Sequence, residues 1–198
     1  MTAKEAGLTT EDIMVDLETL GRRPGCAILS IGAVFFNPIR PSLLPTQVFY
    51  CVVRNDGHQE VLGLHQDPET VDWWEKQSPE ARKVLAAAGR KSGNKQLPGA
   101  LRDFNKFVAS GGPRVRVWGN GADFDNAILS VAMACAGMKP SWEFWNNRCY
   151  STLKSMAARG VNLPARQGVH HNALDDALHQ ARCAEVIMDQ LLARGART

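Results

Sequence analysis

Two carboxylates stand two residues apart in an otherwise apolar stretch near the start of the chain. Asp16 and Glu18 lie in the run 12–18 (DIMVDLE), which predicts a buried central strand. Side chains two apart on a strand share one face, so both carboxylates lie together at the strand's C-terminal end. Burying them is costly unless they are paired or bind a cation. The pattern therefore favours a cation site, with solvent-facing acids on an edge strand as the alternative.

A second group of acidic residues follows a predicted strand through a glycine-containing turn. The segment 118–125 (WGNGADFD) leaves the strand and enters a helix, with Asp125 in the first helical turn. Sites in open α/β sheets form at the carboxyl ends of strands, which favours a functional role for Asp125. The alternative is that Asp123 or Asp125 only caps the helix, since an acid suits a helix N-terminus.

A third segment holds two histidines and two aspartates at a repeated spacing. His170 pairs with Asp175 in one register, and His171 with Asp176 in the other. On the helix predicted over 172–194, Asp176 shares its row with mostly apolar residues (Ala173, Gln180, Ala184 and Ile187), whereas Asp175 shares its row with His179 and Arg182. Asp176 is therefore the better buried acid, and His171 lies in the loop before the helix, free to reach a site. A plain surface histidine is the alternative for His171.

The three segments supply four candidate carboxylates: Asp16, Glu18, Asp125 and Asp176. Carboxylates within a few Å of one another repel by about 4 kcal/mol per close pair at an effective dielectric constant of about 20. Divalent cations can offset that repulsion. An all-oxygen ligand set favours Mg²⁺ or Mn²⁺ over zinc.

The remaining pattern predicts the elements that position these residues. Strands are expected over 12–18, 26–36, 46–53 and 114–118, with a short one near 143–145. Helices are expected over 67–76, 78–88, 101–109, 123–136, 152–159 and 172–194. Short connections make the first three strands an antiparallel meander. Strands followed by alternating helices and strands predict a mixed α/β sheet with helices on its faces.

Composition is that of an ordinary globular protein, and its charge is unevenly distributed. A length of 198 residues favours one domain spanning 1–198, and the formal net charge is +3. Between Lys76 and Arg116, ten Lys and Arg face two Asp and Glu, a balance of +8 that leaves −5 elsewhere. This asymmetry indicates a polyanionic partner beside a carboxylate site, or simply a solvated basic surface. Five scattered cysteines, no visible secretory signal and no long apolar run lead us to expect a cytoplasmic protein with reduced thiols and no membrane contact.

In order and spacing these residues resemble the three motifs of the DEDDh family, the DnaQ-like or proofreading-type 3′–5′ exonucleases. The motifs stand as Asp16-x-Glu18-Thr19, Asn120-Gly-Ala-Asp-Phe124-Asp125 and His171-x-Ala173-x-x-Asp176-Ala177. The stretch 16–36 looks most like small stand-alone phage and prophage exonucleases, some labelled exodeoxyribonuclease VIII-like. The chain is also similar to a bacterial exoribonuclease branch. The resemblance implies a ribonuclease H-like fold with a five-stranded mixed sheet.

It also implies a mechanism and a substrate. Two metal ions held by the four carboxylates, with His171 as general base, would release nucleoside 5′-monophosphates from a nucleic-acid 3′ end. We expect DNA as substrate, with RNA as the alternative. Two further alternatives for its function are a ribonuclease H-like endonuclease and a non-catalytic nucleic-acid-binding module. The resemblance also allows a homodimer.

Substrate contacts are expected from four further residues. By the resemblance, Thr19 and Leu20 would touch the terminal nucleotide through their backbone, and Asn120 would lie near the site. Aromatic side chains often hold single strands by stacking. Trp73 and Trp74 point about 100° apart on a helix, so at most one of them faces substrate, and we expect Trp74 to be that one. Arg22 and Arg23 follow the first strand and either meet phosphates or are simply solvated.

Overall fold

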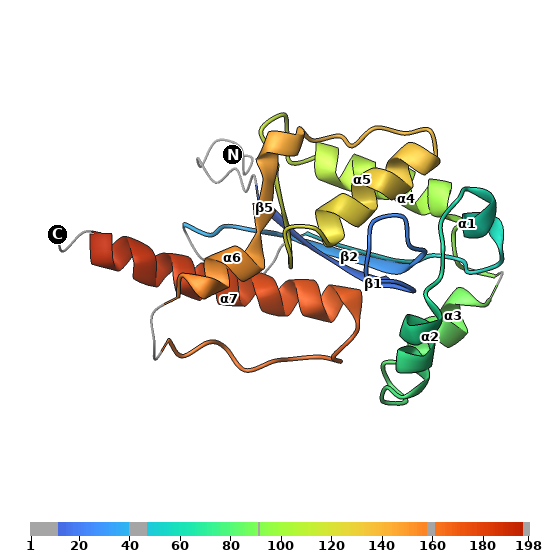
Figure 1. The fold of residues 1–198 in the computed structure, drawn as a ribbon. Helices are drawn as coiled ribbons and strands as arrows, with labels where there is room; N and C mark the ends of the chain where they lie inside the picture. The colour runs from blue at the N-terminus through green and yellow to red at the C-terminus, as the bar shows by residue number, and fades with distance from the viewer. Residues whose placement is uncertain (1–11, 40–46, 91, 158–160, 196–198) are drawn as a thin grey trace.

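The computed structural model describes residues 12–39, 47–90, 92–157 and 161–195, and within them it contains a five-stranded mixed sheet in the order β3-β2-β1-β4-β5 (Figure 1). The strands are β1 (Asp12–Thr19), β2 (Ile28–Phe36), β3 (Val48–Val52), β4 (Arg116–Gly119) and β5 (Asn147–Cys149). β1, β2 and β3 pair antiparallel, which confirms the predicted meander. β4 runs parallel to both β1 and β5.

Helices cover both faces of this sheet. They are α1 (His58–Val61), α2 (Pro68–Glu75), α3 (Lys83–Ala88), α4 (Leu97–Ala109), α5 (Asp125–Cys135), α6 (Tyr150–Ser155) and α7 (Ala173–Gly195). The long α7 runs along one face, and α4 and α5 lie on the other (Figure 1). Among the described residues, no helix is both long and apolar enough to cross a membrane.

The alternation of β1 decides which face carries its acids. Ile13, Val15 and Leu17 are buried in the core cluster with α4 and α5. Met14 points the other way and packs with residues of α7. Because side chains two apart share a face, Asp16 and Glu18 lie on the α7 side of the sheet. The odd positions of β1 thus pack toward α4 and α5, and its even positions, among them Met14 and the two carboxylates, face α7.

A glycine on the neighbouring strand lets the start of α7 approach the sheet. Gly32 pairs with Asp16 in the β1–β2 ladder. A Cβ on Gly32 would lie 2.2 Å from the carbonyl carbon of Ala173, the first residue of α7. That separation is far below van der Waals contact, so only glycine fits beside the backbone here.

We expect Gly32→Ala to lower the free energy of unfolding by about 1–3 kcal/mol, because the added methyl overpacks a site closed by backbone. Gly89→Ala is the matched control, since a Cβ there meets its nearest atom at 3.8 Å. Thermal unfolding of the two variants gives the comparison. Equal unfolding midpoints of Gly32→Ala and Gly89→Ala would contradict the close approach of α7 to β2.

The predicted elements are confirmed with shifted boundaries and two errors. The helix predicted from residue 78 begins at Lys83, and α4 begins at Leu97, four residues before the predicted start. The strand predicted near 143–145 is wrong: Phe144–Asn146 form a 3₁₀ helix, and the paired residues are the polar Asn147–Cys149. The short helix α1 was not predicted. Residue 46 of the third predicted strand and residues 158–159 of the fifth predicted helix lie outside the described part of the chain.

Candidate active site

Three carboxylates from the two ends of the chain meet on the α7 face of the sheet. Asp16 and Glu18 come from β1, and Asp176 comes from the first turn of α7. One oxygen from each lies within 4.8 Å of the other two. Glu18 and Asp176 are buried, whereas Asp16 keeps partial solvent access. The separate predictions from the first and third segments therefore converge on one place.

Asp125 lies next to this cluster and is held by the backbone. It is 1% exposed, and its carboxylate accepts the Leu17 N–H at 3.0 Å and the Asn120 N–H at 2.6 Å. A Cβ on Gly119 would lie 2.9 Å from the Asp125 Cβ, so the strand can pass this close only as glycine. Asp125 thus ties the end of β4 to β1 while placing its charge beside Asp16.

Burial raises the pKa values of Asp16, Glu18 and Asp125, and repulsion between carboxylates adds to the shift for Asp16 and Glu18. Burial raises the pKa of Glu18 to about 8, with further contributions from Asp176 and Asp125. The pKa of Asp16 is also well above its ordinary value, first through burial and then through its acidic neighbours. Burial raises the pKa of Asp125 to about 6, although the backbone hydrogen bonds oppose the shift. Negative charge at this site is therefore strongly disfavoured without a compensating cation.

Two residues that the sequence did not single out as site residues touch the acids. Arg166 forms an ion pair with Asp176, and Gln180 Nε2 donates to Asp16 Oδ1 at 2.6 Å. Gln180 is one helical turn after Asp176, so its position on the inward row was a usable signal. Arg166 lies in an irregular segment, where no periodicity reports which way a side chain points.

The chemistry of this donor set fits a divalent cation. Glu18 Oε1 is buried and, among the described residues, is one of the side-chain atoms without a hydrogen-bond partner. An orphaned carboxylate oxygen beside two further carboxylates is costly in the protein alone. Asp16, Glu18 and Asp176 therefore fit hard, oxygen-seeking ions.

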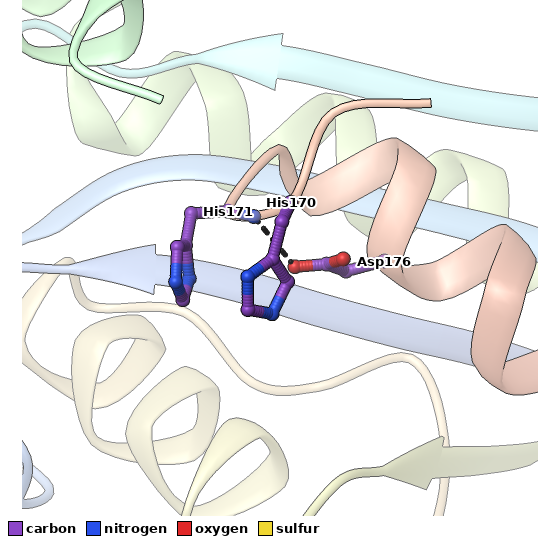
Figure 2. Close-up of side chains that lie close together, drawn as sticks. All are labelled: His170, His171 and Asp176. Carbon is purple, nitrogen blue, oxygen red and sulfur yellow. Dashed lines mark hydrogen bonds between the residues drawn. The ribbon is translucent and has the colours of Figure 1, made fainter. Parts of the chain in front are cut away.

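His171 lies at the rim of the carboxylate cluster. Its backbone is held by Asp176, the aspartate of the same predicted register. Its N–H donates to Asp176 Oδ2 at 3.1 Å (Figure 2). Burial lowers the pKa of the His171 imidazole, His170 and Arg166 lower it further, and Asp176 opposes them. Asp175 is instead used to accept the Val169 N–H at 2.7 Å. Asp176 is thus the buried acid, as its helical row predicts.

A pocket over the acids exposes one tryptophan and buries the other. Trp73 is 41% exposed, and its ring lies 4.9 Å from that of His171, nearly perpendicular to it. Trp74 is 1% exposed and donates its indole N–H to the Thr19 carbonyl at 2.8 Å. Both tryptophans line the pocket, but stacking on a base needs an accessible ring face, which Trp73 has and Trp74, the residue expected from the sequence, does not.

Of the other residues expected to contact substrate, some line the pocket and one is buried. Thr19 and Asn120 line the pocket with the acids. Leu20 is buried, its N–H donates to the Ala27 carbonyl, and its own carbonyl accepts the Asp67 N–H. Its backbone is thus already used inside the protein. Arg22 lines the pocket and forms an exposed ion pair with Glu69.

The basic segment 76–116 is partly neutralised within the protein. Lys95 pairs with Asp103, and Arg116 pairs with Asp12 on β1. Lys76, Arg82 and Lys83 are exposed just after α2, whose residues line the pocket, and at the start of α3. The surface available to a polyanion is therefore smaller than the charge count suggests.

The five-stranded mixed sheet and the meeting of Asp16, Glu18 and Asp176 agree with the DEDDh-type exonuclease domain that the three sequence motifs resemble. A family model described as "3'-5' exoribonuclease Rv2179c-like domain" matches residues 11–188. The chain belongs to this family of Rv2179c-like exoribonuclease domains.

Solved structures with the same fold include nucleases of low sequence identity. E. coli exonuclease I in complex with a dA16 oligonucleotide is 16% identical, with a TM-score of 0.59 over 92% of this chain and 43% of that chain. The nuclease domain of 3'hExo, a DEDDh family member bound to rAMP, is 12% identical, with a TM-score of 0.58 over 90% of this chain and 92% of that one.

A curated relative gives a weaker sequence match. The exodeoxyribonuclease of Enterobacteria phage T4 is 24% identical over 130 residues, which are 60% of this chain and 53% of that protein. The chain thus spans about half the length of this relative.

Proposed function

We propose that residues 1–198 form one metal-dependent exonuclease domain that releases nucleoside 5′-monophosphates from nucleic-acid 3′ ends. The observation that carries the proposal is the cluster of Asp16, Glu18 and Asp176, with one buried carboxylate oxygen of Glu18 left without a partner. These residues would hold two Mg²⁺ or Mn²⁺ ions, with Asp125 beside them. When bound, such ions activate a water molecule and stabilise the leaving oxygen of an in-line displacement.

His171 is proposed as the general base. Because its pKa is lowered, the imidazole is neutral at neutral pH and can accept a proton. The hydrogen bond from the His171 N–H to Asp176 fixes the main chain from which the ring extends. Asp176 thus has two proposed roles, as a metal ligand and as the anchor of the base.

RNA is the proposed substrate, on the support of the family match over residues 11–188. DNA, the substrate expected from the sequence, is the second candidate, and the T4 exodeoxyribonuclease favours it. The test compares kcat/KM on single strands of identical sequence made of RNA and of DNA, each with a 5′ label and Mg²⁺. A higher kcat/KM on RNA supports the proposal, and a higher value on DNA overturns its substrate.

Trp73 is proposed to stack on a base of the bound strand. We expect Trp73→Ala to raise KM roughly 5- to 150-fold, since stacking on an aromatic ring contributes about 1–3 kcal/mol per base. Trp73→Phe keeps an aromatic ring and should stay near the wild-type KM. Steady-state kinetics on one single-stranded oligonucleotide compares the three proteins. A Phe variant as impaired as the Ala variant would contradict stacking.

A further inference from the structure

A second possible ligand set shares one residue with the carboxylate cluster. His170, His171 and Asp176 each offer one ligand atom within 4.8 Å of the other two (Figure 2). Two of these three donors are imidazole nitrogens, whereas the cluster with Asp16 and Glu18 offers only oxygens. His170 is exposed and has no part in the proposed hydrolysis. The pairing of these histidines therefore calls for its own explanation.

The backbone of the turn before α7 brings the two rings together. Neighbouring side chains of an extended chain point to opposite sides. Here His171 has φ 64°, a left-handed conformation that non-glycine residues rarely adopt. Both rings point to the same side of the turn (Figure 2), with centroids 3.8 Å apart and planes 35° apart. Uncommon backbone conformations of this kind cluster at functional sites, where the surrounding structure holds them.

We propose that His170, His171 and Asp176 bind a Zn²⁺ ion, and that this ion inhibits the enzyme. Two imidazole nitrogens and one carboxylate oxygen suit zinc, which takes three protein ligands and leaves a fourth position for water. Mg²⁺ and Mn²⁺ prefer oxygen ligands and would stay at the carboxylate cluster.

Asp176 has room for this additional contact. One of its oxygens pairs with Arg166, and the other accepts the His171 N–H. A carboxylate offers about four lone-pair positions, so these two contacts leave others available to an ion. Inhibition follows because zinc would occupy the imidazole that must accept a proton and would share a ligand with the catalytic ions. This second half of the inference rests on the proposed function, whereas zinc binding does not.

Zinc affinity is measured first, without substrate, by competition with a chromophoric chelator. Wild type should bind one Zn²⁺ that His170→Ala binds at least 10-fold more weakly. His65→Ala is the matched control, because His65 is also exposed beside an aspartate, Asp67, but lies outside this cluster. Thermal unfolding of the zinc-free proteins shows that both variants fold. Equal affinity in wild type and His170→Ala would overturn the site.

Inhibition is then measured with Mg²⁺ in excess and Zn²⁺ added, each protein being compared with its own zinc-free rate. Wild type and His65→Ala should lose at least 10-fold in rate at the Zn²⁺ concentration that fills the site, and His170→Ala should lose much less. Equal inhibition of all three proteins, or none in wild type at full occupancy, would overturn inhibition through this site. A wild type that hydrolyses nothing with Mg²⁺ would overturn the proposed function and the inhibition together, and leave zinc binding standing on the first measurement.

Discussion

Asp16→Asn should abolish hydrolysis at 3′ ends and at the same time stabilise the metal-free protein. The rate should fall by at least about 10³-fold, because a neutral amide cannot replace an anionic ligand of the proposed cations. The free energy of unfolding should rise by about 1–3 kcal/mol near pH 7, because burial and three acidic neighbours raise the pKa of Asp16. Single-turnover rates with Mg²⁺ and thermal unfolding with chelator measure the two effects.

The opposite signs of these effects distinguish a functional acid from a structural one. Asp123→Asn is the matched control, since Asp123 is an exposed acid two residues before Asp125. It should change neither quantity by much. A loss of stability in Asp16→Asn, or activity within about 10-fold of wild type, would contradict the assignment of Asp16.

Without divalent cations, the protein should become less stable as pH rises from about 5 to about 8. The pKa of Glu18 is raised to about 8 and that of Asp125 to about 6, so the folded state holds protons that the unfolded state has released. Stability falls with pH wherever the folded state binds more protons. The expected loss is on the order of 5 kcal/mol, most of it from Glu18, at a slope of about 1.4 kcal/mol per proton and pH unit. The lowered pKa of His171 acts in the opposite direction, but only below its ordinary value of 6.5.

Thermal unfolding across this pH range, with chelator and with saturating Mg²⁺, tests the prediction. Mg²⁺ should raise the midpoint most at the alkaline end, because a ligand that binds only the folded state stabilises it by mass action. In Glu18→Gln the slope with chelator should be shallower, since the group that titrates near pH 8 is gone. A chelated wild type that gains stability toward pH 8 would contradict the raised pKa values.

Regular periodicity made much of the fold and site predictable. The even positions of β1 put Asp16 and Glu18 on one face, and the helical row of Asp176 selected it over Asp175. The features that could not be predicted depend on contacts between segments that are far apart in the sequence. The burial of Trp74 depends on the Thr19 carbonyl and on the packing of α2 and α3 against the β1–β2 turn, which helical periodicity does not report.

Irregular segments were the least predictable. The strand β5 is polar and has no apolar alternation. The strand was therefore predicted a few residues too early, at the exposed Phe144 and Trp145. Arg166 reaches Asp176 from a segment without helix or strand. The left-handed φ of His171 is likewise invisible in its residue type, since only glycine adopts that region freely.

The most direct test of the central claim is the product of one reaction on a 5′-labelled RNA strand. With Mg²⁺, wild type should shorten the strand stepwise from its 3′ end and release nucleoside 5′-monophosphates, while chelated wild type and Asp16→Asn should leave it intact. A circular strand of the same composition should also stay intact. Internal cuts, nucleoside 3′-monophosphates, or equal hydrolysis with chelator would contradict the account.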